Sequence, residues 1–191
     1  MKFLKEIPSP SKKEQIILTA MNLFSEQGFD ATPMPKLAEI AGVGTGTIYR
    51  YFPSKEILLN EIYRLYKLKV EEYVLADFDK NKSVEKKFKY LCNRWIDISI
   101  QDPKLFSFLE LQNYFPYLDE DSLRIEENFM KVIVKFIKDG QKENKLVNGD
   151  PILIFGMVTG AITKVFKTKL IWTEISIKSC VDLCWKMVSK N

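Results

Sequence analysis

The side chains best suited to chemistry gather in one run between residues 45 and 55, and their types favour contacts with nucleic acid. Arg50 can donate two parallel hydrogen bonds to a guanine, and Gly46 allows a backbone to approach DNA closely because it has no side chain. Hydroxyl groups and an ammonium group in the same run suit phosphate oxygens. The predicted contacts are Thr45, Gly46, Thr47, Tyr49, Arg50, Tyr51 and Lys55.

Catalytic chemistry has no comparable set of residues. The sequence contains no histidine, which excludes histidine-dependent general bases, triads with histidine and histidine-ligated zinc. No Gly-rich phosphate loop is present either. We interpret the unevenly placed Cys92, Cys180 and Cys184 as small core residues rather than as redox or metal-binding groups. The sequence therefore predicts a protein that is not an enzyme and has neither a cofactor nor a metal.

The predicted contacts need short helices to present them, and the preceding residues supply the signals for such helices. Ser11 can cap a helix that ends at Gly28, and Thr32 can cap a second helix that ends at Gly42. A third helix is predicted at residues 45–51, after the tight turn at Gly42. Helices in this order form a helix-turn-helix, in which the last helix lies in the major groove and the one before it crosses the DNA backbone.

The segment from Ala38 to Glu56 resembles the DNA-binding signature of the TetR repressor family. It combines the tight-turn glycine, a Gly-Thr-Ile-Tyr-x-Tyr-Phe run that begins at Gly46, and a following Lys-Glu pair. Extended back to the Leu23-Phe24 and Gly28-Phe29 pairs, the resemblance covers about the first quarter to third of the chain. It implies an all-helical homodimer whose C-terminal bundle holds the dimer contact and an inducer pocket. The family's DNA contacts then fall on Thr45, Gly46, Thr47, Tyr49, Tyr51 and Lys55.

Two departures from the family pattern affect the predicted DNA contacts. Met34 and Pro35 stand where the family often has a basic or hydroxyl residue, so we expect Thr32 or Lys36 to take over a phosphate contact. Thr45 occupies a place often held by lysine, which reduces the electrostatic share of binding and leaves the preferred operator open.

Helical periodicity continues to the C-terminus, so the predicted fold is all-α with about nine helices. We expect a helix-turn-helix domain at residues 1–55, a linking helix at residues 54–75, and a ligand-binding and dimerisation domain at residues 56–191. The seventh helix is predicted to end near Asn148-Gly149. The absence of a signal peptide, and apolar runs too short to span a bilayer, indicate a cytoplasmic protein without membrane contact.

The middle of the chain is rich in aromatic residues interleaved with a few polar ones, which is typical of a small-molecule pocket between helices. Such a pocket would take a small, largely apolar or aromatic effector. The alternative is an ordinary core, since buried aromatics dominate cores in general. The candidate ligand contacts are Trp95, Phe106, Phe108, Glu110, Asn113, Tyr114 and Phe129.

The helix that follows Asp150 is apolar on nearly every side, and its Gly156 and Gly160 allow another helix to approach closely. With Phe166, and Cys184 on the last helix, these glycines are the candidate dimer contacts. Burial within one subunit is the alternative, because periodicity does not distinguish the two. A two-fold dimer predicts a near-palindromic operator in double-stranded DNA.

These features together predict a repressor that a small molecule releases from its operator. The alternatives are a helix-turn-helix regulator without an effector, and a helical adaptor that binds another protein.

Overall fold

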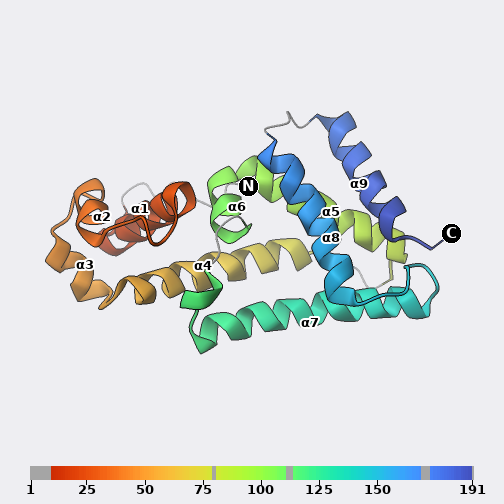
Figure 1. Ribbon diagram of the computed structural model, residues 1–191, viewed down its shortest axis with the longest axis horizontal. Helices are drawn as coiled ribbons and strands as arrows, with labels where there is room; N and C mark the ends of the chain where they lie inside the picture. Colours follow the sequence, from red (N-terminus) through yellow and green to blue (C-terminus); the bar gives the residue numbers. More distant parts are fainter. Residues whose placement is uncertain (1–9, 79–80, 111–113, 169–172, 191) are drawn as a thin grey trace. The chain divides into compact units, whose positions relative to one another are not determined.

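The computed structural model describes residues 10–78, 81–110, 114–168 and 173–190, and the described residues form an all-α fold, as predicted (Figure 1). Its elements are α1 (Lys12–Gln27), α2 (Met34–Ile40), α3 (Thr45–Tyr51), α4 (Lys55–Leu75), α5 (Val84–Gln101), α6 (Pro103–Glu110), the 3-10 helix η1 (Phe115–Tyr117), α7 (Glu120–Lys142), α8 (Pro151–Lys167) and α9 (Glu174–Val188). Within the described ranges, β pairing is limited to one isolated bridge between Leu146 and Ser189. None of the described helices is long and apolar enough to cross a membrane.

The chain divides into two compact units, each assembled from segments that are distant in sequence. The first unit contains Met1–Val70 and Gln101–Ile125, and the second contains Glu71–Ile100 and Glu126–Asn191. This division differs from the boundary expected near residue 55, because α6 packs on α1 and so joins the first unit. The boundary at residue 55 remains a prediction about which residues bind DNA.

The first helix begins and ends where the sequence predicts. The Ser11 hydroxyl accepts a hydrogen bond from the Glu14 backbone N–H, and the Glu14 carboxylate accepts one from the Ser11 N–H at 2.8 Å. The Ser11 hydroxyl and the Ser11 N–H both donate to the Glu14 carboxylate, and these two hydrogen bonds hold the pKa of Glu14 below its usual value. At the other end, Gly28 has a φ of 86°, a conformation that glycine adopts without strain. The buried side of α1 consists of Ile16, Ile17, Ala20, Met21, Phe24 and Ser25.

The second helix begins differently from the prediction. Pro33, and not Thr32, is its N-cap residue. Thr32 is fully buried, and its hydroxyl donates to the Gly28 carbonyl at 2.7 Å while it accepts from the Gln27 side chain. The Thr32 hydroxyl thus forms its hydrogen bond within the α1–α2 connection and does not cap α2. A buried hydroxyl needs a hydrogen-bond partner, and the Gly28 carbonyl is within reach.

The second unit packs α5, α7, α8 and α9 around an apolar core. Helix α7 ends at Lys142, short of the predicted Asn148-Gly149, because Asn144 adopts a φ of 54° and turns the chain. The N–H groups of Lys145 and Leu146 then both donate to the Gly140 carbonyl, at 2.9 and 3.1 Å. Leu146 is fully buried as a result. Its neighbours pair with the end of α9, where the Val147 N–H donates to the Val188 carbonyl.

Candidate nucleic-acid interface and apolar cavity

Helix α3 turns nearly all of its side chains away from the core. Ile48 is the one buried residue among its seven, all of which belong to the described chain. Tyr49 and Tyr51 are 47% and 37% exposed, and Thr45 and Thr47 are half-buried. Apart from its chain neighbours and the backbone of its own helix, no described atom lies within 4 Å of the position that a Cβ would take at Gly46, so this part of the helix is open to a partner backbone.

The turn between α2 and α3 depends on a single glycine. Gly42 has a φ of 65°, and the next residue, Val43, donates its N–H to the Ala38 carbonyl at 3.0 Å. A side chain in this left-handed conformation would be strained. The glycine therefore holds the two helices of the predicted helix-turn-helix in one compact turn.

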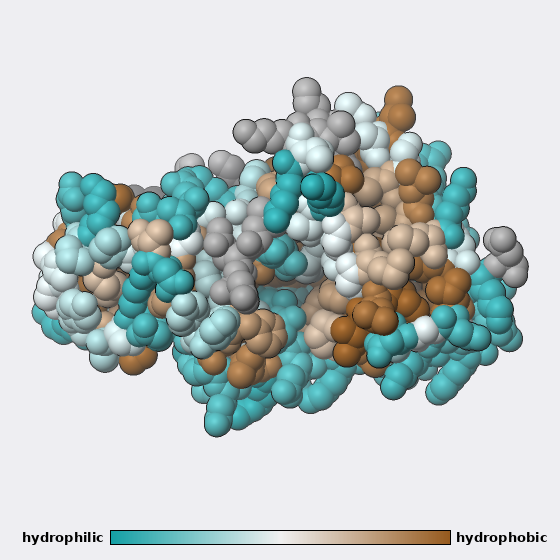
Figure 2. Space-filling model, in the orientation of Figure 1, coloured by the Kyte–Doolittle hydropathy of each residue, from teal (hydrophilic) through white to brown (hydrophobic). Residues whose placement is uncertain are grey.

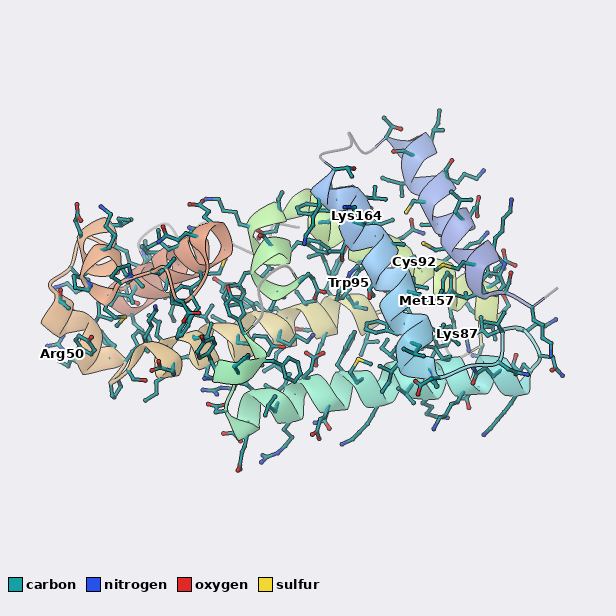
Figure 3. All side chains as sticks on the ribbon, in the orientation of Figure 1. Arg50, Lys87, Cys92, Trp95, Met157 and Lys164 are labelled. Atoms are coloured by element: carbon teal, nitrogen blue, oxygen red, sulfur yellow. The ribbon has the colours of Figure 1, made fainter. Side chains whose placement is uncertain are left out.

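Arg50 and Lys55 are the two cations of the predicted contact run, and the structure holds them differently. Arg50 is exposed, with its guanidinium 5.4 Å from the centre of the Tyr51 ring (Figure 3). Lys55 is half-buried at the start of α4, and its Nζ lies 4.3 Å from the centre of the Phe29 ring. Partial burial lowers the pKa of Lys55, while the nearby carboxylates of Asp30 and Glu56 oppose that shift.

Lys36 and Thr32, the two contacts expected from the departures in the family pattern, differ in their exposure. Lys36 is exposed on α2, with its ammonium 3.0 Å from the Glu39 carboxylate. Thr32 is fully buried and has its hydroxyl engaged, so it lies away from any surface that DNA could reach. We leave Thr32 out of the candidate interface.

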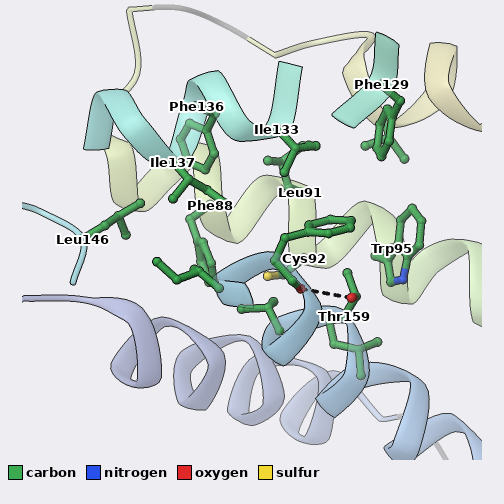
Figure 4. Close-up of a pocket in the computed structure, with 15 residues that line it drawn as sticks. Phe88, Leu91, Cys92, Trp95, Phe129, Ile133, Phe136, Ile137, Leu146 and Thr159 are labelled. Carbon is green, nitrogen blue, oxygen red and sulfur yellow. Dashed lines mark hydrogen bonds between the residues drawn. The ribbon is translucent and has the colours of Figure 1, made fainter. Parts of the chain in front are cut away.

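A cavity lies inside the second unit, between α5, α7 and α8 (Figure 4). None of the described residues that line it carries a charge. The Thr159 hydroxyl donates a hydrogen bond to the Phe155 carbonyl of its own helix at 3.0 Å. Trp95 and Phe129 lie toward one end in Figure 4, and Phe88 and Leu146 toward the other. The lining consists of Val74, Phe88, Leu91, Cys92, Trp95, Phe129, Ile133, Phe136, Ile137, Leu146, Ile154, Phe155, Val158, Thr159 and Ile162.

The predicted ligand contacts do not all meet at this cavity. Trp95 and Phe129 line it, whereas Phe106, Phe108 and Tyr114 are buried in the first unit. The Phe108 and Tyr114 rings pack on each other there, with centres 4.8 Å apart. Glu110 also belongs to the first unit, and Asn113 lies outside the described residues.

Most of the residues that line the cavity were missed by the sequence-based prediction. Ile133, Phe136 and Ile137 come from the most strongly periodic stretch of the sequence, and Val158 comes from the apolar helix after Asp150. Their periodicity showed that these faces are buried. A buried face can border either a filled core or a cavity, and local sequence does not separate the two.

Helices α8 and α9 expose a large apolar surface, which Figure 2 shows as brown and tan atoms gathered over these helices. Leu153, Met157 and Leu183 are 67%, 58% and 65% exposed. Outside the chain neighbours and the backbone of α8 itself, no described atom approaches within 4 Å of a Cβ position at Gly156 or Gly160. Of the other candidate dimer contacts, Phe166 is half-buried. Cys184 is buried within the unit, since that position of α9 faces inward.

Comparisons with known families account for nearly the whole chain. Residues 16–62 match the family of bacterial regulatory proteins called tetR, and residues 65–190 match the tetracyclin repressor-like C-terminal domain.

Individual relatives extend this likeness. The fatty acid metabolism regulator protein of Bacillus subtilis is 23% identical over 80% of this chain and 82% of its own length. The HTH-type transcriptional repressor KstR2 of Rhodococcus jostii is 29% identical, with 68% of this chain and 67% of the repressor covered.

Solved structures show the same fold. A TetR family transcription regulator from Marinobacter aquaeolei has a TM-score of 0.78 at 17% identity, and covers 94% of this chain and 96% of its own. The fatty acid degradation regulator FadR from Bacillus halodurans has a TM-score of 0.71 at 22% identity, over 93% and 96% of the two chains.

Proposed function

This chain belongs to the tetR family of bacterial regulatory proteins and is a DNA-binding transcriptional regulator, and we propose that it represses transcription until a small apolar effector releases it from a near-palindromic operator. The observation that carries the proposal is the outward face of α3, which presents hydroxyls, two tyrosine rings and Arg50 while Ile48 alone of its seven residues is buried. Such a face suits the major groove, and Lys55 adds a cation for the phosphate backbone.

The apolar cavity of the second unit supports the effector part of the proposal. Its lining of aliphatic and aromatic side chains favours a hydrocarbon group and disfavours a charge, because a charge placed there would lose its hydration without a counter-charge. Two relatives are named for fatty acid metabolism or degradation. We therefore infer that an acyl chain is the first effector group to test.

The exposed apolar surface of α8 and α9 supports a homodimer. Monomeric proteins rarely leave a large contiguous apolar surface in water. A two-fold pairing through α8 and α9 would bury this surface and provide two α3 helices for the two half-sites of one operator. We propose that the dimer acts in the cytoplasm.

Selection of bound sequences from a random double-stranded DNA pool by the purified full-length chain tests the DNA-binding proposal. We expect a near-palindrome whose half-sites lie about one helical turn, or ~34 Å, apart. A pool without enrichment would contradict operator binding. A single asymmetric site would contradict binding as a two-fold dimer.

The recovered duplex then serves as the probe for the effector. Fatty acids and acyl thioesters of graded chain length are titrated against the protein–DNA complex, and we expect release that increases with chain length up to the limit of the cavity. A true effector must bind the free protein more tightly than the DNA-bound protein. If no apolar compound releases the DNA, the chain is a regulator without such an effector.

A further inference from the structure

The Phe29 ring contacts two residues that are far apart in the sequence. Tyr117 of η1 packs against it, with ring centres 4.5 Å apart and an interplanar angle of 41°. The ammonium of Lys55 also lies over this ring, 4.3 Å from its centre. All three residues belong to the first unit, which carries the candidate DNA interface.

Tyr117 also engages the acidic residue beside Phe29. Its hydroxyl donates to both carboxylate oxygens of Asp30, at 2.8 and 2.9 Å. This carboxylate is one of the two charges that act on the Lys55 ammonium. The Asp30 carboxylate thus has two potential partners. One is the neutral Tyr117 hydroxyl, from which it accepts a hydrogen bond in the structure, and the other is the Lys55 ammonium, on which its charge acts.

The position of Tyr117 is itself secured through α4. The Tyr117 backbone carbonyl accepts a hydrogen bond from the side-chain amide of Asn60 at 2.8 Å. The side-chain oxygen of Asn60 in turn accepts one from the Asp119 N–H at 2.9 Å. Arg64 donates to both carboxylate oxygens of Asp119, at 2.9 and 2.7 Å. The hydroxyl therefore reaches Asp30 from a backbone that α4 holds in place.

We propose that Tyr117 is a positioning residue for DNA binding, which occupies the Asp30 carboxylate and so keeps the Lys55 ammonium available for a DNA phosphate. The proposal rests on the proposed function, in which Lys55 contacts the phosphate backbone. Without the hydroxyl, the Asp30 carboxylate loses this donor, while its charge still acts on the Lys55 ammonium. An ion pair between Asp30 and Lys55 would then compete with the phosphate for the same ammonium.

The Tyr117→Phe variant tests the proposal because it keeps the ring on Phe29 and removes the hydroxyl alone. The probe is the duplex recovered by selection with the wild-type chain, and its affinity is measured against potassium chloride concentration. Loss of one phosphate contact should make the slope of log K against log salt shallower by about 0.9. The Asp30→Asn/Tyr117→Phe double variant should recover the wild-type slope, because asparagine carries no charge to hold Lys55.

A purely structural role for Tyr117 predicts a different pattern, in which the double variant binds DNA as weakly as Tyr117→Phe or more weakly. That result would overturn the proposal, as would an unchanged slope in Tyr117→Phe. Thermal unfolding of each variant establishes that the compared chains are folded at the temperature of the binding measurement.

A second measurement on the free protein separates failure of this inference from failure of the proposed function. The pKa of Lys55 is followed by NMR in chains with 13C-labelled lysine, with Lys55→Arg to assign the signal. We expect the pKa to be higher in Tyr117→Phe than in wild type, and the rise to disappear in the double variant. An unchanged pKa overturns the competition between Tyr117 and Lys55 whatever the DNA results, whereas a wild-type chain that binds no duplex overturns the proposed function.

Discussion

At the scale of single residues, the two cations of the candidate DNA interface differ in how firmly the structure holds them. Arg50 is exposed and beside the Tyr51 ring, so its guanidinium can turn toward a base edge. Lys55 is half-buried against Phe29, so its ammonium has a narrower choice of positions. A fixed point charge suits the regularly spaced phosphates, whereas a planar guanidinium suits a guanine.

Replacing Lys55 by alanine should therefore weaken binding to all duplexes alike. A phosphate contact carries no sequence information, so the ratio of affinities between two duplexes should stay the same. The slope of log K against log salt should become shallower by about 0.9. Titrations of the selected duplex and of a scrambled duplex at several salt concentrations measure both quantities; a changed ratio would show that Lys55 reads a base.

Replacing Arg50 by alanine should instead change which sequences are preferred. Loss of a bidentate pair with guanine reduces discrimination at one position of each half-site by roughly 1–3 kcal/mol. A second selection from the random pool with Arg50→Ala, compared with the wild-type selection, tests this. If the recovered sequences are the same, Arg50 contacts phosphate.

At the scale of elements, the end of α7 depends on a position where only glycine fits. A Cβ placed on Gly140 would lie 2.7 Å from Leu146 Cδ1, 2.9 Å from Leu146 Cγ and 3.0 Å from Val84 Cγ1. Leu146 is fully buried and Val84 nearly so, which leaves little room for either to move. The same turn places Leu146 in the lining of the apolar cavity.

The Gly140→Ala variant should consequently destabilise the protein by about 1–3 kcal/mol, the usual cost of overpacking a core. The matched control is Gly149→Ala, whose Cβ would meet Ile154 at an ordinary 3.7 Å. Denaturant unfolding of both variants measures the difference. Equal stability of the two variants would mean that the turn relaxes around the added methyl group.

Helices α4 and α7 each contribute residues to both compact units. Helix α7 begins at Glu120, three positions after Tyr117, and its later residues Phe129, Ile133 and Phe136 line the cavity. Helix α4 likewise runs from Lys55 to Leu75 and contributes Val74 to the lining. Helix α4 is therefore continuous from Lys55 to a residue that lines the cavity, and α7 is continuous from just after η1 to the cavity.

At the scale of the whole molecule, the apolar surface of α8 and α9 is the feature that a single chain leaves unexplained. Leu183, 65% exposed on α9, is a large side chain left in contact with water. Burial of such side chains in a dimer would be favourable by about 25 cal/mol for each Å² of apolar surface removed from water.

Replacing Leu183 by glutamate should therefore shift the protein toward the monomer. A carboxylate buried in the interface without a partner costs roughly 3 kcal/mol or more, which raises the dimer dissociation constant at least about a hundredfold. Val132→Glu, at a 39% exposed position on α7, is the control and should leave the dimer intact. Sedimentation equilibrium measures both; a wild-type monomer at micromolar concentration would contradict the dimer itself.

Local contacts explain which predictions succeeded. The Ser11 cap of α1, the start of α3 at Thr45 and the start of α8 after Asp150 depend on residues a few positions apart, so their signals are complete in the sequence. The prediction of Thr32 as a cap failed because its hydroxyl had a second local partner, the Gly28 carbonyl. The predicted end of α7 failed because Asn144 turns the chain before the glycine at residue 149.

The sequence by itself determined that the chain is helical and that α3 presents Arg50 and its neighbours, because periodicity and capping encode both. Only the tertiary structure decided which aromatics share a site, since it places Trp95 at the cavity and Phe106 in the other unit. It also brought Tyr117 to Asp30 across 87 positions. The physical reason is that a periodic pattern shows that a face is buried, whereas the partner that buries it is selected by packing between distant segments.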